Sequence, residues 1–109
     1  MGSTGAFLVR GPMRVRDMKY SDYGITEERR KALLNYCRSN PDIELLTTAA
    51  MYANLELHEL LIKNLKEGIG WNGLSYLCYI PIGEVDFYGY RRKALANLDA
   101  LLIGEDIQI

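Results

Sequence analysis

The sequence is poor in cysteine, histidine and proline, and these shortages exclude several classes of protein. Its 109 residues include 2 cysteines, 1 histidine and 3 prolines. Cys37 and Cys78 are too few and too far apart in the chain for a disulfide scaffold or a zinc site. Because each lies in an apolar stretch, we expect both to be reduced and buried, in a cytoplasmic protein of a bacterial host. A single disulfide between them is the alternative, and it needs an oxidising compartment.

A net charge of either sign and long hydrophobic runs are also missing. The sequence has 13 Lys and Arg residues and 14 Asp and Glu residues, so the formal net charge is −1. Nucleic-acid-binding domains usually carry a basic excess, so a nucleic-acid surface would have to be local here. No apolar run approaches the roughly 18 residues that a membrane helix needs, and we expect no membrane partner. With 49 % apolar and 25 % charged residues, the composition is that of a globular domain rather than a disordered chain.

The chain divides into four parts by composition and periodicity. The expected parts are an expression leader at 1–12, a basic arm at 13–25, a single helical domain at 26–104 and a loose acidic tail at 105–109. Gly11 and Pro12 before Met13 resemble a vector junction followed by a native start. In the arm, Arg14 and Arg16 alternate with apolar residues.

Apolar residues recur at helical spacing through most of the central domain, and no segment predicts a β-hairpin. A capping residue, an acidic first turn or a proline precedes each expected helix. The expected starts are Thr26, Asn40 with Pro41, Asn54, Asn72, and Glu84 or Asp86. Gly68 and Gly104 are the expected terminators of the third and the last helix. The sequence therefore predicts an all-α fold, a small bundle of about five helices with a helix-turn-helix-like C-terminal pair.

That C-terminal pair consists of a short helix, a turn at Pro81-Ile82-Gly83 and a long helix with a basic stretch. A helix-turn-helix domain joins two helices by such a turn and places the second in the major groove of DNA. An ordinary corner between two bundle helices fits the same pattern. If the long helix binds DNA or another partner through residues 84–97, aromatic, basic and amide side chains are the candidate contacts. These residues are Tyr90, Arg91, Arg92, Lys93 and Asn97.

Three residues outside that helix are further candidates for the same surface. Arg14 and Arg16 of the arm could meet phosphates or acidic groups. Trp71 lies in a glycine-rich segment that we expect to be a loop, and an exposed tryptophan is a frequent hot spot in interfaces. Trp71 equally fits a structural role at the end of the bundle, over Ile69 and Leu74.

Residues 80–98 carry a recognisable order of residue types. An apolar Ile-Pro-Ile precedes a Phe-Tyr pair, which is followed by a basic stretch and an Ala-Leu continuation. The residues concerned are Ile80, Pro81, Ile82, Phe87, Tyr88, Tyr90, Arg91, Arg92, Lys93, Ala94 and Leu95. This order resembles the helix-turn-helix of late-gene transcription regulators encoded by phages of Gram-positive bacteria. The resemblance implies a sequence-specific DNA-binding regulator with the broad layout of a sigma-factor C-terminal domain.

The sequence offers little for catalysis. His58 is the only histidine, and no motif brings it to a nucleophile such as Cys37 or Cys78. Glu56 and Glu59 lack the second Glu-x-x-His helix of a di-metal bundle, and no glycine-rich phosphate loop follows a strand. We therefore expect no enzymatic activity, no cofactor and no metal.

Two functions from different classes stay open. The first is a phage or mobile-element transcription regulator that binds double-stranded DNA. The second is a non-catalytic phage-encoded inhibitor or adaptor of a host bacterial protein: a polymerase, a nuclease or a defence complex such as CRISPR. The near-neutral charge favours the second and the local motif favours the first. Either protein could act as a homodimer.

Overall fold

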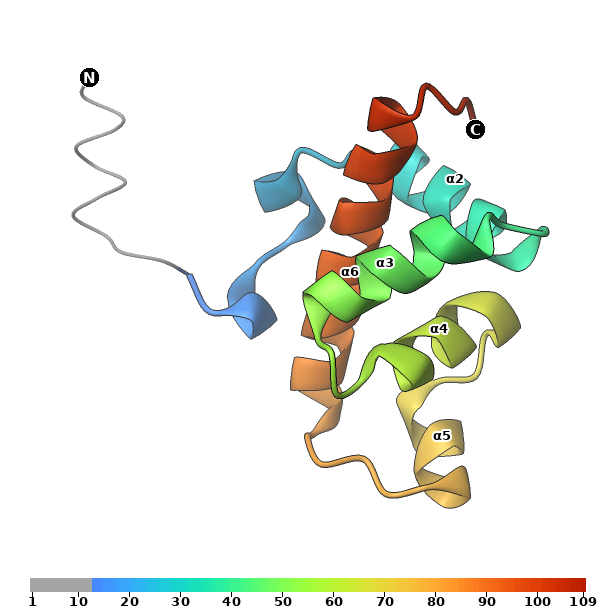
Figure 1. Cartoon of the computed structure of the whole chain (residues 1–109). Helices are drawn as coiled ribbons and strands as arrows, with labels where there is room; N and C mark the ends of the chain where they lie inside the picture. The colour runs from blue at the N-terminus through green and yellow to red at the C-terminus, as the bar shows by residue number, and fades with distance from the viewer. Residues whose placement is uncertain (1–12) are drawn as a thin grey trace.

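The computed structural model describes residues 13–109, and the expected leader at 1–12 lies outside the described residues. Five α-helices and two short 3-10 helices follow one another (Figure 1). In chain order they are η1 (Val15–Asp17), η2 (Tyr20–Tyr23), α2 (Glu27–Arg38), α3 (Ile43–Ala53), α4 (His58–Glu67), α5 (Trp71–Leu77) and α6 (Glu84–Gly104). Residues 13–109 contain no strand, so the predicted all-α bundle of about five helices is confirmed.

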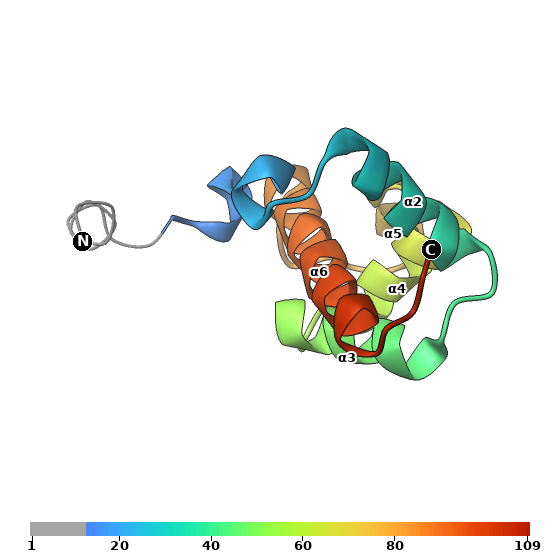
Figure 2. The ribbon, with the colours of Figure 1, turned by 90° about the horizontal axis from the view of Figure 1, so that it is seen from above.

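The long helix α6 is the centre of the bundle. Seen from above, it runs between α3 on one side and α2 on the other, with α4 and the N-terminal arm on the two remaining sides (Figure 2). Its apolar residues are spread around the helix rather than gathered in one stripe, as expected for a helix that is covered on several sides. The buried ones are Phe87, Gly89, Ala94, Leu95, Leu98 and Leu102.

The first two α-helices begin at side-chain caps, of which only one is the predicted residue. Thr26 accepts a hydrogen bond from the Arg29 backbone N–H at 3.1 Å, as predicted. Asn40 does not cap α3, and that prediction is wrong. It adopts a left-handed conformation with a φ of 61° after the end of α2, which asparagine tolerates better than most residues. Asp42 caps α3 instead, accepting from the Leu45 N–H at 3.2 Å.

The next two helices begin one to four residues away from the predicted positions. Asn54 accepts a hydrogen bond from the Leu57 N–H at 3.1 Å, but it closes a turn, and α4 begins only at His58. The fourth helix, α5, begins at Trp71 after Gly70, so Trp71 is helical rather than part of a loop and Asn72 is not a cap. Gly68 ends α4 in a left-handed conformation, as predicted.

The connection between α5 and α6 is longer than predicted. Helix α5 ends at Leu77 because the Cys78 backbone is extended, with a φ of −160° and a ψ of 167°. Residues 78–83 then lead to α6, whereas a helix-turn-helix has a turn of about three or four residues.

The last helix ends in a Schellman motif built without glycine. Gly104 is still helical, contrary to its predicted role as terminator. Asp106 takes the left-handed conformation with a φ of 57°, and its N–H donates to the Ile103 carbonyl at 3.1 Å. The Ile107 N–H donates to the Leu102 carbonyl at 2.9 Å, and the Ile107 side chain packs on the core. The tail is therefore folded back at Ile107 rather than loose there.

The two cysteines differ in their surroundings. Both are free thiols; Cys37 is buried, as predicted. Cys78 is exposed, and the prediction that it is buried is wrong, because it lies in the connection after α5 rather than on an inner helix face.

Candidate functional site

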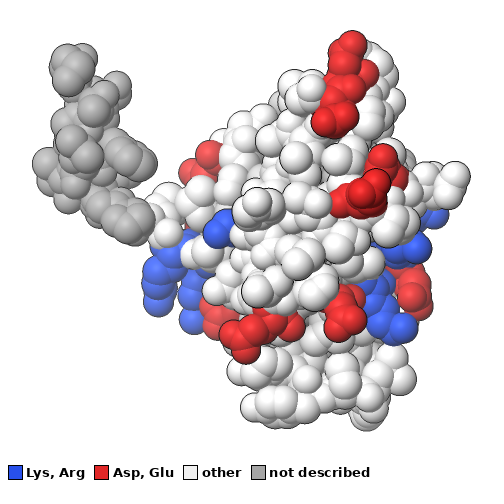
Figure 3. All heavy atoms as spheres, in the orientation of Figure 1, with Lys and Arg blue, Asp and Glu red and all other residues white. Residues whose placement is uncertain are grey.

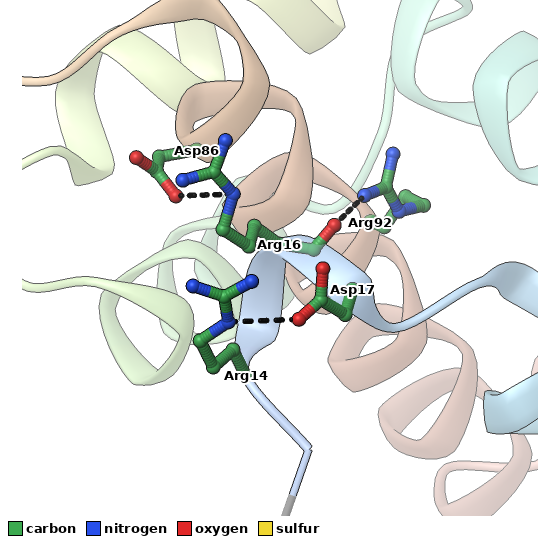
Figure 4. Close-up of polar contacts among 5 residues, drawn as sticks. All are labelled: Arg14, Arg16, Asp17, Asp86 and Arg92. Carbon is green, nitrogen blue, oxygen red and sulfur yellow. Dashed lines mark hydrogen bonds and ion pairs between the residues drawn. The ribbon is translucent and has the colours of Figure 1, made fainter.

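The basic residues of the arm are paired with carboxylates. The Arg14 Nε lies 2.8 Å from a carboxylate oxygen of Asp17 within η1. The Arg16 Nε lies 3.5 Å from Asp86 in the first turn of α6, so this pair joins the arm to the central helix (Figure 4). All four side chains are at least one-third exposed, so these pairs are weakly stabilising, but they neutralise both cations locally.

Arg92 holds the arm on α6. Its Nε donates to the Met18 carbonyl at 2.8 Å and its Nη2 donates to the Arg16 carbonyl at 3.1 Å. Figure 4 shows the guanidinium of Arg92 directed to the backbone carbonyl of Arg16 in the arm. A charged donor on two carbonyls makes stronger hydrogen bonds than a neutral one. Three candidate cations, Arg14, Arg16 and Arg92, therefore come together at the arm, with their donors directed to groups of this chain.

Arg91 points to the other side of α6, away from the arm. Its Nη1 lies 3.5 Å from the Asn64 Oδ1 in α4, and its guanidinium carbon lies 5.0 Å from the centre of the Tyr88 ring. Its Nε is buried and has no hydrogen-bond partner among the described residues. Arg91 and Arg92 thus lie on different sides of the helix.

The other candidate residues of α6 differ in whether they contact the rest of the bundle. Asn97 donates to the Ala49 carbonyl at 3.1 Å and so ties α6 to α3. Tyr90 is half-buried and packs against the core. Lys93 is half-buried too, and it makes no ion pair within residues 13–109.

Trp71 makes internal hydrogen bonds from both its backbone and its ring. Its backbone N–H donates to the Tyr88 hydroxyl at 3.0 Å. Its Nε1–H donates to the Ile82 carbonyl at 3.3 Å, across the connection before α6. The indole is half-buried and packs against the core, so Trp71 joins α5, the connection and α6.

A surface of a different kind lies at the lower end of the molecule in Figure 1, where α5 and the connection to α6 are found. Residues 68–83 contain no Asp, Glu, Lys, Arg or His, and we call this segment the uncharged tip. Tyr76 is 91 % exposed, Tyr79 85 % and Leu77 65 %, and the neighbouring Val85 is also exposed. Figure 3 shows the same end of the molecule as a surface without charged side chains on the face drawn.

The uncharged tip was missed by the sequence reasoning, although a signal for it is present. A stretch of this length without charge is unusual in a chain that is 25 % charged. The exposure of Tyr76 and Tyr79 could not be predicted, because the spacing of apolar residues does not tell whether a short helix buries one face or two.

Comparison with known proteins finds no matching family model, no matching curated protein and no matching solved structure. Within the described residues, no three His, Cys, Asp or Glu side chains gather so that they could hold a metal ion. The helices between residues 13 and 109 include none with the length and hydropathy needed to cross a bilayer.

Proposed function

We propose that this protein is a non-catalytic protein-binding module, an inhibitor or adaptor that acts on a host bacterial protein through the uncharged tip. The observation that carries the proposal is the exposure of Tyr76, Leu77 and Tyr79 within a segment that has no charged residue. Tyrosines are enriched among the residues that dominate binding energy, and charged residues are depleted at interface centres.

The energetics of this surface support a protein partner. Burying exposed apolar and aromatic surface against a partner contributes roughly 25 cal/mol of favourable free energy for each Å² removed from water. A tyrosine ring can be buried against a partner while its hydroxyl still forms hydrogen bonds at the edge of the contact. Tyrosine therefore suits a surface that is exposed to water in the free protein and buried in the complex. The Trp71 ring links α5 to the connection through its hydrogen bond to the Ile82 carbonyl, and a contact of this kind reduces the conformational entropy that binding must cost.

The surroundings of the basic residues support this proposal over DNA binding through α6. Sequence-independent affinity for DNA comes from cations that are free to reach phosphates. Here Arg14 and Arg16 face carboxylates, and Arg92 donates to backbone carbonyls. The second turn of α6 is also covered, since the backbone of the arm lies over Gly89. Double-stranded DNA stays the target that the resemblance of residues 80–98 predicts, and a salt titration tests it separately.

A cross-linking experiment tests the proposal. A benzophenone amino acid replaces Tyr79, or Tyr52 as a control, because Tyr52 is 77 % exposed but lies on α3. Each protein is irradiated in a nuclease-treated bacterial lysate. We expect one host protein to cross-link from position 79 and not from position 52. The absence of any adduct, or the same adducts from both positions, would contradict the proposal.

The captured protein is then identified, purified and titrated with variants. Tyr76→Ser combined with Tyr79→Ser should weaken binding by about tenfold or more, the size expected for the loss of interface anchors. The control variant Tyr52→Ser should bind as the original protein does. Both tip tyrosines are almost fully exposed, so the melting temperature should stay nearly unchanged.

A further inference from the structure

The first part of the arm, residues 13–19, lies on α6 without adding a side chain to the core, and we call it the strap. Its helix η1 contains no buried residue, and neither Val15 nor Met18 belongs to the core or to the side chains packed against it. The next segment differs, because Tyr20 and Tyr23 of η2 pack against the core. Segments with few buried apolar contacts open at a lower free energy than the whole domain. The strap is therefore the part of the arm that can leave α6 while η2 stays in place.

Polar contacts and backbone packing hold the strap on α6. Arg92 donates from Nε to the Met18 carbonyl at 2.8 Å and from Nη2 to the Arg16 carbonyl at 3.1 Å (Figure 4). The Arg16 side chain in turn pairs with Asp86 at 3.5 Å, and the backbone of η1 lies over Gly89. A hydrogen bond to a carbonyl can be exchanged for one to water or to a ligand oxygen. These contacts can therefore be broken without exposing the core.

The donors of Arg92 are arranged as in an oxyanion site. Nε and Nη2 lie on one edge of the planar guanidinium, and with such an edge arginine binds two oxygens of a phosphate or a carboxylate. Two carbonyl oxygens of the strap occupy this edge. Neither Arg92 nor Lys93, the next residue of α6, forms an ion pair within residues 13–109. Two adjacent cations without a carboxylate favour a ligand with more than one negative charge, as a phosphate group has.

We propose that Arg92 and Lys93 form a phosphate-binding site that the strap of the same chain covers. In the closed form, the carbonyl oxygens of Arg16 and Met18 occupy the positions of two phosphate oxygens. When the strap leaves α6, a phosphate group takes their place on Arg92. The strap is thus a self-inhibitory contact. The site lies outside the uncharged tip and goes beyond the proposed function.

The opening of the strap and the binding of phosphate are thermodynamically linked. Because the ligand binds only the open form, its apparent affinity is the intrinsic affinity reduced by the open fraction. A change that opens the strap should therefore tighten binding even when it alters no cation. By the same linkage, the ligand should open the strap. Opening also frees the Asp86 carboxylate, but this residue lies six positions before Arg92, about 9 Å along the helix, so it opposes phosphate only weakly.

Inorganic tripolyphosphate is the first probe, and calorimetric titration of the full chain at constant ionic strength measures its dissociation constant. We expect weak binding to the original protein and binding about tenfold or more tighter to Gly89→Ala, because the added methyl group overlaps the Arg16 backbone. Gly104→Ala is the matched control, since nothing lies within 4 Å of a Cβ there, and it should bind as the original protein does. Adding Arg92→Gln to Gly89→Ala should abolish the gain.

Hydrogen exchange tests the same linkage without any substitution. Tripolyphosphate well above its dissociation constant should speed amide exchange of the original protein in residues 15–18 and leave exchange in α3 unchanged. Sodium chloride at equal ionic strength is the control and should have a smaller effect on the strap. Unchanged or slower exchange in residues 15–18 would mean that phosphate does not displace the strap, and the inference would be wrong.

A short DNA duplex distinguishes two sources of phosphate. If Gly89→Ala binds the duplex as well, the backbone of a nucleic acid is a ligand of the open form; if it binds tripolyphosphate alone, the ligand is a free phosphate compound. Equal affinity of Gly89→Ala and the original protein for both probes, or a gain that survives Arg92→Gln, overturns the inference. None of these results affects the cross-link at position 79, which tests the protein-binding function separately.

Discussion

Gly89 of α6 lies directly beneath the backbone of Arg16 in the arm. A Cβ atom at position 89 would be 2.9 Å from the Arg16 Cα and 3.2 Å from the Arg16 N. Because these are backbone atoms, they cannot turn aside as a flexible side chain would. The glycine is therefore explained by close packing of η1 on α6, although it costs about 1 kcal/mol of helix propensity relative to alanine.

The first prediction concerns this contact. Gly89→Ala should release the arm, because the overlap with the Arg16 backbone costs about 1–3 kcal/mol and cancels the gain in helix propensity. Hydrogen exchange should show faster exchange in residues 15–23, and the melting temperature should not rise. Gly104→Ala is the control, since nothing lies within 4 Å of a Cβ there. It should raise stability by up to about 1 kcal/mol. Equal stabilisation by both variants, with the arm still protected, would refute the packing role of Gly89.

The second prediction separates two neighbouring cations. Arg92→Gln should destabilise the protein by about 1–3 kcal/mol, because hydrogen bonds from a charged donor to two carbonyls of the arm are lost. Lys93→Gln should change stability by less than about 0.5 kcal/mol, since no ion pair is lost. Urea unfolding of both variants measures the difference. If the two curves coincide, Arg92 does not anchor the arm.

The third prediction follows from the buried thiol. Burial raises the pKa of Cys37 from 9.0 to about 12. In the unfolded chain the thiol ionises near pH 9, whereas in the folded protein it keeps its proton until about pH 12. The contribution of the Cys37 thiol to the free energy of unfolding is therefore complete below pH 9. It is lost as the pH rises toward 12, at about 1.4 kcal/mol per pH unit.

Urea unfolding between pH 8 and 11 measures this loss. The variant Cys37→Ala should be less stable at neutral pH but should have a flatter pH profile. The pKa of Tyr23 is raised by burial as well, so its loss of stability has the same sign and stays in both proteins. Identical slopes for the two proteins would show that the thiol does not contribute.

The fourth prediction tests DNA binding directly. If DNA is a target, affinity should fall with salt by about 0.9 logarithmic units per phosphate contact for each logarithmic unit of salt. With most candidate cations paired within the chain, we expect no shift of a duplex probe at physiological salt and at most weak binding at low salt. Tight binding with a slope of about 3–5 would favour the regulator predicted from residues 80–98. The matched variant is Lys93→Gln, which should reduce the slope only in that case.

Helix positions were largely predictable because their causes are local. Apolar spacing and a capping threonine need only a few neighbouring residues, and the Thr26 cap lies where it was predicted. The wrong predictions concern helix ends at which two nearby residues could each serve as the cap or terminator. Asn40 and Asp42 are both good caps, and Gly104 and Asp106 both suit a helix end. Which of them is used depends on how the chain must turn to pack the next segment.

The sequence by itself determined an all-α chain and the place of most helices, because hydrogen bonds and apolar periodicity act within one or two turns. Tertiary structure decided which polar groups were left for a partner. Arg16 meets Asp86 and Arg92 meets Met18 only after residues about 70 apart in the chain are brought together by the packing of the arm on α6. The absence of charge in residues 68–83 is a property of the sequence. The exposure of Tyr76 and Tyr79 comes from the fold, because the short helix α5 has only one face against the bundle and leaves the other to solvent.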